Sequence, residues 1–131
     1  MPFENSEFWL TPPDLLEEMN REFKFDFDAC PYPRPDDFDG LTCEWGSSTY
    51  VNPPFKAPTA WVRKALAETE KGKRVVFVFP VDKWVLMLLT HPSLKEVRNL
   101  KDVKWHSTKT GLPGKGIGRH IACFVLEKND S

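Results

Sequence analysis

The feature that most constrains this chain is a continuous apolar run, Val75 to Phe79, which Pro80 closes. An unbroken run of β-branched and aromatic residues is typical of a buried parallel strand, covered on both faces. A helical pattern precedes it, with Thr59 predicted as its N-cap and Gly72 as its end. The residues before that helix, Thr49 to Val51, favour another strand. Strand, helix and strand in this order predict a βαβ unit, and therefore an α/β fold.

The length of 131 residues predicts one domain, residues 1–131, with a single core. With 40% hydrophobic and 28% charged residues, the composition is that of a soluble globular protein. No apolar run approaches the roughly 20 residues of a membrane span, and the N-terminus lacks the pattern of a signal peptide. We therefore expect a cytoplasmic protein. The three cysteines and three histidines show no metal-ligand spacing, so no metal is expected.

The net charge of −1 conceals two halves of opposite sign. Residues 1–50 hold 3 basic and 12 acidic side chains, whereas residues 51–131 hold 15 basic and 7 acidic ones. A pI near 6 alone argues against a nucleic-acid partner, but a chain divided in this way can still present one positive face. Charge therefore neither favours nor excludes nucleic acid.

Further elements follow from shorter patterns. A helix is predicted from about residue 12 to 23, with Thr11 as its N-cap. The alternation from Phe23 to Asp28 predicts a strand, and an acid at its end is either a ligand contact or a plain strand terminator. The remaining predictions are a packed loop over residues 31–45, a third helix from Lys83 to Leu89 capped by Asp82 (or a strand there), a weak strand at Val103 and Trp105, and a final strand from Ile121 to Leu126.

The stretch with the clearest chemistry is Asn52, Pro53, Pro54 and Phe55, at the predicted carboxyl end of a strand. The Asn52 side-chain carbonyl and the Pro53 main-chain carbonyl form a rigid pair of acceptors, because the second proline restricts the backbone of the first. Two such acceptors suit the two N–H groups of an exocyclic base amine, and Phe55 offers a face for stacking. The alternative interpretation is an ordinary Asn-Pro turn in a proline-rich chain.

A second candidate is the loop from Thr108 to Arg119, which contains four glycines and no acid. Its cations Lys109, Lys115 and Arg119 suit backbone phosphates of a nucleic acid. The loop lacks the context and spacing of a nucleotide-triphosphate loop. A hairpin connection without chemistry is the alternative.

With these motifs placed, the chain resembles the phage-type DNA N6-adenine methyltransferase (Dam) family over roughly residues 8 to 126. The resemblance rests on a W-x-T-P opening, an F-D-A-C segment, an Asp-Gly-Leu segment followed by tryptophan, the N-P-P-F motif, and the helix before Gly72. These segments are Trp9 to Pro12, Phe27 to Cys30, Asp39 to Leu41 with Trp45, Asn52 to Phe55, and Trp61 to Ala65.

The resemblance implies a compact Rossmann-like fold that binds S-adenosylmethionine. Its sheet would be mostly parallel, with an antiparallel C-terminal strand, and would be shortened between the first strand and the N-P-P-F strand. No F-x-G-x-G loop follows that first strand, and the ribose-binding acid is open among Asp36, Asp37, Asp39 and Glu44. The implied cofactor-binding residues are Trp9, Thr11, Pro12, Asp28, Ala29 and Asp39.

The implied activity is methyl transfer from S-adenosylmethionine to the 6-amino group of adenine in DNA, with the base flipped out of a duplex. Asn52, Pro53, Pro54 and Phe55 would be the catalytic residues. The expected partners are DNA and the cofactor, and the expected state is a monomer or small homo-oligomer, in the host cytoplasm if a phage encodes the chain. Two alternatives stay open: an inactive methyltransferase-like module that binds nucleic acid or protein, and a methyltransferase for RNA adenine or protein glutamine.

Overall fold

A computed structural model describes residues 9–31, 36–54, 57–80, 82–101, 103, 106–107 and 120–128. The elements in chain order are β1 (Trp9–Leu10), α1 (Pro13–Phe23), β2 (Phe27–Asp28), β3 (Ser48–Val51), α2 (Pro58–Glu70), β4 (Arg74–Pro80), α3 (Val85–Leu89), β5 (Leu94–Lys101), β6 (His106–Ser107) and β7 (Ile121–Glu127). The α/β class and the βαβ unit β3–α2–β4 are confirmed.

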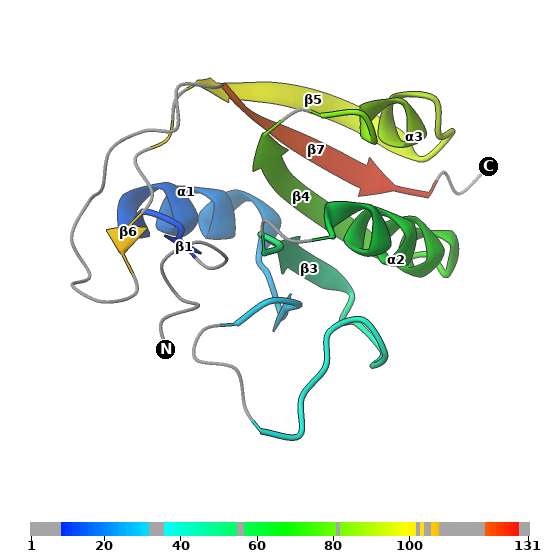
Figure 1. Ribbon diagram of the computed structural model, residues 1–131, viewed down its shortest axis with the longest axis horizontal. Helices are drawn as coiled ribbons and strands as arrows, with labels where there is room; N and C mark the ends of the chain where they lie inside the picture. Colours follow the sequence, from blue (N-terminus) through cyan, green and yellow to red (C-terminus); the bar gives the residue numbers. More distant parts are fainter. Residues whose placement is uncertain are drawn as a thin grey trace.

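The main sheet has five strands in the order β2-β3-β4-β7-β5. β2, β3 and β4 run parallel, whereas β7 is antiparallel to both of its neighbours. Figure 1 shows this as the single arrow that points opposite to β3, β4 and β5. The expected antiparallel C-terminal strand is confirmed, and the other four strands of this sheet share one direction. Because β7 lies inside the sheet rather than at its edge, it contributes two antiparallel pairings and the sheet is mixed.

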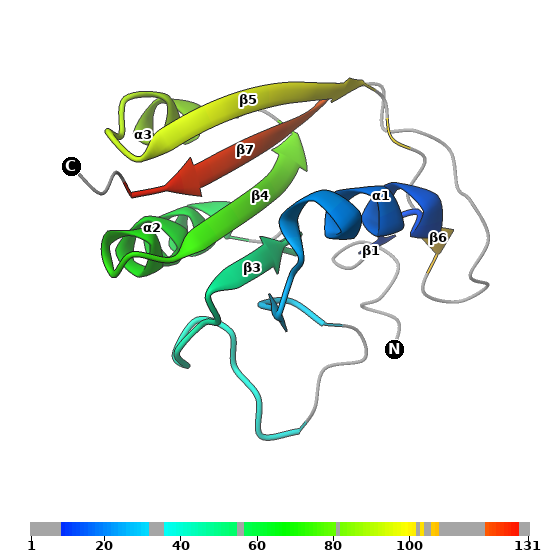
Figure 2. The ribbon, with the colours of Figure 1, turned by 180° about the vertical axis from the view of Figure 1, so that it is seen from behind.

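Two core clusters fill the two faces of this sheet. α2 and α3 cover one face, where Trp61, Val62 and Phe77 belong to the larger cluster. α1 covers the other face, where Phe23 and Val76 belong to the second cluster. Figures 1 and 2 show these two layers from opposite sides. The strand predicted from Val75 to Phe79 is almost fully buried because both layers close on it.

All three helix caps predicted from the sequence are wrong. The N-cap of α3 is Trp84, not Asp82, and no side chain caps this helix. The residue before α1 is Pro12, and Thr11 makes no capping bond. α2 begins at Pro58, one residue before Thr59, and its N-cap is Ala57 in a left-handed conformation with φ 56°. In both helices a proline occupies the first turn, where its fixed φ suits the helix and its missing N–H costs nothing.

One predicted strand is shorter than expected, and one strand of the sheet was not predicted. The strand expected from Phe23 to Asp28 is reduced to β2, because α1 continues to Phe23 and Lys24 ends it in a left-handed conformation. β5 was not predicted at all. Its pairing with β7 shifts register twice, so its apolar residues follow neither a strand nor a helix period. The third helix is present but shorter, from Val85, and the final strand is confirmed.

Within the described residues, no helix is both long and apolar enough to cross a lipid bilayer.

Candidate active site

Asn52 directly follows β3, at the edge of the sheet where the parallel strands end. Its side chain is half-buried, Pro53 is buried and Pro54 is half-buried. The Asn52 Nδ2 donates a hydrogen bond to Thr11 Oγ1 at 3.3 Å, across 41 positions of sequence. The motif before α1 and the motif after β3 therefore meet at one point.

Tyr50, two residues before Asn52, belongs to the same arrangement. Its hydroxyl lies 2.6 Å from Thr11 Oγ1, and the residue is 4% exposed. Burial raises the pKa of this phenol above its usual range, although the hydrogen bond to Thr11 acts in the opposite direction. Tyr50 entered the sequence interpretation only as a strand former. The signal that could have found it is that a buried tyrosine needs a partner for its hydroxyl.

Asp28 ends β2 and pairs in register with Tyr50 of β3. Its side chain is exposed at the surface, yet the protein atoms packed around the carboxylate raise its pKa above the usual value. The backbone N–H of Cys30 donates to Asp28 Oδ1 at 2.9 Å and opposes that rise. Ala29, the next residue, is fully buried, and its N–H bonds to the carbonyl of Tyr50 at 3.1 Å.

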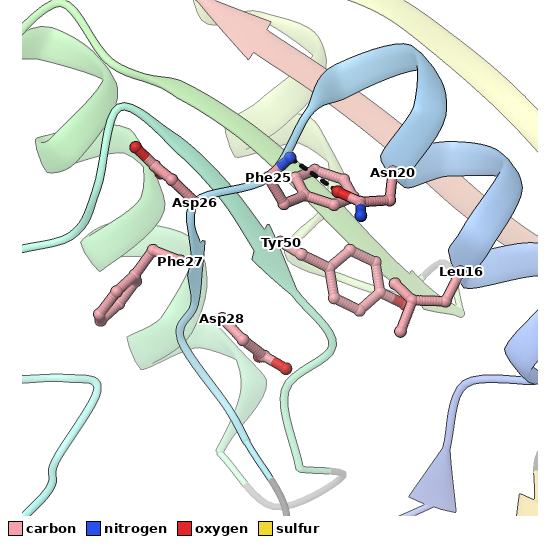
Figure 3. Close-up of a pocket in the computed structure, with 7 residues that line it drawn as sticks. All are labelled: Leu16, Asn20, Phe25, Asp26, Phe27, Asp28 and Tyr50. Carbon is pink, nitrogen blue, oxygen red and sulfur yellow. Dashed lines mark hydrogen bonds between the residues drawn. The ribbon is translucent and has the colours of Figure 1, made fainter.

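A cavity of about 330 Å³ lies between β2, β3 and α1. Figure 3 shows Asp28 and Tyr50 on the side of β2 that faces α1, together with Leu16, while Phe27 points to the opposite side. The cavity is lined by Leu16, Asn20, Phe25, Asp26, Phe27, Asp28 and Tyr50. Aromatic and aliphatic side chains form most of its walls, and the carboxylates of Asp26 and Asp28 and the amide of Asn20 add polar groups. This composition suits a flat organic group that carries a positive charge.

A second, smaller cavity of about 60 Å³ lies where β2 and β3 end, and Asp39, Ala29 and Pro54 all line it. The loop that carries Asp39 is held close to the end of β2. A Cβ added at Gly40 would lie 2.1 Å from the Ala29 carbonyl oxygen, so a residue without a side chain is required there. The Gly40 carbonyl also accepts a 2.7 Å bond from Trp45 Nε1. Three predicted site residues from separate segments thus share one cavity.

The four acids considered for the ribose differ in position. Asp39 accepts a hydrogen bond from the Leu41 N–H at 2.9 Å and lines the smaller cavity. Glu44 pairs with Lys73 at 2.7 Å and with Lys71 at 3.4 Å, at the amino-terminal end of the parallel strands. Asp36 and Asp37 lie in an exposed turn. Of the four, Asp39 is the acid that lies beside other predicted site residues.

Neither Cys30 nor Cys123 offers an activated nucleophile. Burial raises the pKa of Cys30 above its usual range and that of Cys123 to about 11, so both thiols stay protonated at neutral pH. All three cysteines are free. In the described part of the chain, no three histidine, cysteine or acidic side chains are grouped as a metal ion would require.

Several predicted site residues lie outside the described residues, namely Phe55, Lys109, Lys115 and Arg119. Trp9 is placed by its backbone, in the two-stranded pairing of β1 with β6. Pro12 leads from Thr11 into α1.

A family model described as DNA N-6-adenine-methyltransferase (Dam) matches residues 1–102. This range includes every element from β1 to β5 and the whole N-P-P-F motif, whereas β6 and β7 follow it. No curated protein matches the chain.

Proposed function

The chain belongs to the DNA N-6-adenine-methyltransferase (Dam) family, and from this premise we propose that it transfers a methyl group from S-adenosylmethionine to the 6-amino group of adenine in DNA. One observation supports this proposal most directly. Asn52 stands at the carboxyl end of β3, fixed by Thr11, beside the end of β2 that carries Asp28. Parallel strands of α/β proteins present their ligands at this edge.

The chemistry assigned to the site is activation of an amine. The Asn52 side-chain oxygen and the Pro53 main-chain oxygen would each accept a hydrogen bond from the adenine amine. Two accepted bonds increase the electron density on the nitrogen as it attacks, so this stabilisation grows toward the transition state. Phe55 would stack on the base. The amine nitrogen would gain the bond to the methyl carbon as that carbon's bond to the cofactor sulfur breaks, which leaves the cofactor as a neutral thioether, and the methylated amine would then lose one proton to solvent.

The residues present are suited to S-adenosylmethionine. The cavity of about 330 Å³ falls within the roughly 300–1,000 Å³ of small-molecule sites and combines aromatic walls with the Asp28 carboxylate. Asp28, Ala29 and Asp39 would hold the cofactor along the ends of β2 and of the loop after it. Thr11 and Pro12 would border it from the start of α1, and Trp9 precedes them. When bound, the cofactor supplies an electrophilic methyl group on a sulfonium.

The proposed fold is a shortened Rossmann-like domain that spans residues 1–131. In its favour, β2 and β3 are parallel neighbours, and the described residues between them contain no further strand or helix. The loop that carries Asp39 would therefore form the side of the cofactor site that additional strands form in other Rossmann-like domains.

The proposed substrate is DNA, with the target base flipped out because a paired adenine cannot present its amine to a pocket. The cations Lys109, Lys115 and Arg119 would contact backbone phosphates. If they do, replacing all three by Gln weakens binding mainly at low salt and reduces the salt slope by roughly one unit per lost phosphate contact. Lys95→Gln, a charge removal on β5, is the matched control.

The decisive experiment supplies cofactor with a labelled methyl group to the protein together with double-stranded DNA, single-stranded DNA, RNA or a glutamine-containing protein. We expect the label in N6-methyladenine from DNA. Label in RNA or in glutamine would replace the proposed substrate with that acceptor. If no acceptor is labelled and calorimetry shows no cofactor binding, the protein is a binding module and the proposed function is wrong.

A further inference from the structure

The hydroxyl of Tyr50 has a defined partner among the residues that the structure describes. That partner is Thr11 Oγ1, at 2.6 Å. Burial raises the pKa of Tyr50, so the phenol keeps its proton at neutral pH. Each of the two hydroxyls therefore carries a proton, and either can donate it to the other. The contact fixes the position of the Thr11 oxygen in both cases.

The same threonine oxygen accepts a hydrogen bond from the Asn52 Nδ2 at 3.3 Å. With Nδ2 directed at Thr11, the carbonyl oxygen of the Asn52 amide lies on the other side of the planar group. A threonine that donates its one proton to Tyr50 has none left for the carbonyl of a rotated amide, so its oxygen can only accept from Nδ2.

We propose that Tyr50 is a positioning residue that acts through Thr11 to fix the orientation of the Asn52 amide. This inference rests on the proposed function, because orientation matters only if Asn52 Oδ1 accepts a hydrogen bond from the substrate amine. A rotated amide would present its own N–H groups to an amine that also donates, and the bond that activates the nitrogen would be lost.

The position of Tyr50 suits this role because its own backbone and ring are fixed. Its carbonyl accepts the Ala29 N–H at 3.1 Å, and β3 is paired on both sides by β2 and β4. Its ring lies 5.3 Å from that of Phe25. A hydroxyl on a rigid ring in a central strand gives Thr11 one reproducible direction of approach, which a flexible side chain could not.

The kinetic test compares Tyr50→Phe, Thr11→Val and Thr11→Ser with the wild-type protein. Tyr50→Phe and Thr11→Val each remove the bond between these two side chains. We expect kcat to fall about ten-fold with KM for DNA little changed, because a rotated Asn52 amide cannot accept the hydrogen bond that activates the amine. Thr11→Ser keeps the oxygen and should restore kcat. Because both changes break the same unit, the double variant should lose little more than either single one.

A matched control is Thr49→Val, which removes a buried hydroxyl from the neighbouring residue of β3, where Thr49 Oγ1 bonds to the Gly46 carbonyl. A structural defect in β3 would lower activity in this control as well. An equal loss of kcat in Thr49→Val and Tyr50→Phe would therefore overturn the inference, as would an unchanged kcat in Tyr50→Phe.

A readout independent of turnover separates this inference from the proposed function. The Asn52 side-chain amide signals, followed by 15N NMR without substrate, should shift in Tyr50→Phe and Thr11→Val but return toward wild type in Thr11→Ser. If the wild-type protein methylates nothing while these shifts occur, the proposed function fails and the orienting contact stands. If the signals do not respond, Tyr50 does not orient Asn52.

Discussion

The two ends of the central sheet treat a carboxylate in opposite ways. At the amino-terminal end, Glu68 is 1% exposed and is bonded by lysines at 2.7, 2.9 and 3.0 Å, as well as by the Trp45 N–H. At the carboxyl-terminal end, Asp28 accepts one backbone bond and forms no ion pair with any described residue. The charge of Glu68 is thus neutralised by side chains of the protein, whereas the Asp28 carboxylate can still accept hydrogen bonds from a ligand.

The contrast extends to the direction in which each pKa moves. Burial opposes ionisation of Glu68, but the three lysine hydrogen bonds outweigh it and lower the pKa to about 2. The pKa of Asp28 rises, because burial outweighs its single backbone bond. A carboxylate is therefore stabilising where charged partners surround it, as at Glu68, and costs stability where packed protein atoms leave it without such partners, as at Asp28.

The largest effect should come from the carboxyl-terminal end. Replacing Asn52 with Ala removes one of the two proposed acceptors and should lower kcat about 100- to 1,000-fold, as for other preorganised hydrogen bonds to a reacting group. Thermal unfolding should change little, because Asn52 is half-buried and outside the core. Label transfer to adenine measures the first effect and calorimetry the second. Asn99→Ala, on β5, is the control, and an equal loss in both variants would contradict a special role for Asn52.

At the other end of the sheet, Glu68→Gln should cost about 3 kcal/mol of unfolding free energy, because lysines gathered around a carboxylate lose their counter-charge. Urea denaturation measures this loss. Glu70→Gln is the matched control on the same helix, where the exposed acid pairs with His91 and contributes less than about 1 kcal/mol. Similar losses of unfolding free energy in both variants would mean that the lysine contacts of Glu68 stabilise the protein no more than a surface ion pair does.

The same carboxylate should shape the acid stability of the protein. A group with a folded pKa of about 2 and an ordinary value of 4.5 contributes stability that is complete above pH 4.5. That contribution is lost as the pH falls toward 2, and it amounts to about 3 kcal/mol in total. Urea titrations at several pH values should therefore show a steeper acid loss in wild type than in Glu68→Gln. If the unfolding free energies of both proteins fell equally with pH, the loss of stability in acid would come from other groups.

The smallest effect should have the opposite sign. Because the folded protein raises the pKa of Asp28, ionised Asp28 opposes folding at neutral pH, and stability returns as the pH falls through that pKa. Asp28→Asn should thus raise the unfolding free energy slightly, by less than about 1 kcal/mol for so exposed a group. The same change should weaken cofactor binding in calorimetry. If Asp28→Asn instead lowered the unfolding free energy, Asp28 would be an acid that stabilises the fold, as Glu68 does.

The sequence predicted what local pattern and strong burial determine. The βαβ unit around the Val75 strand was accessible because a strand buried on both faces leaves an unbroken apolar run. β5 was missed because an edge strand with two register shifts leaves no period to detect. Its exposed face also places few constraints on residue type.

Within the candidate site, the same distinction applies to individual residues. Asn52 and Asp28 could be selected because each follows a recognisable strand. Thr11 was selected by resemblance, but its contact with Tyr50 joins residues 39 positions apart, and no local pattern encodes such a pair. Gly40 is similar, since the close approach of the Ala29 carbonyl becomes apparent only in three dimensions.

The place of β7 has a consequence for how the molecule assembles. The strand formed last along the chain is inserted between β4 and β5, which are otherwise not joined. During synthesis, one edge of β4 therefore stays without its native partner until residues 121–127 leave the ribosome, and until then β5 pairs with no other strand that the structure describes. Because closing such a non-local pairing is slow, folding should proceed from a β3–α2–β4 nucleus, with late insertion of β7 as its rate-limiting step.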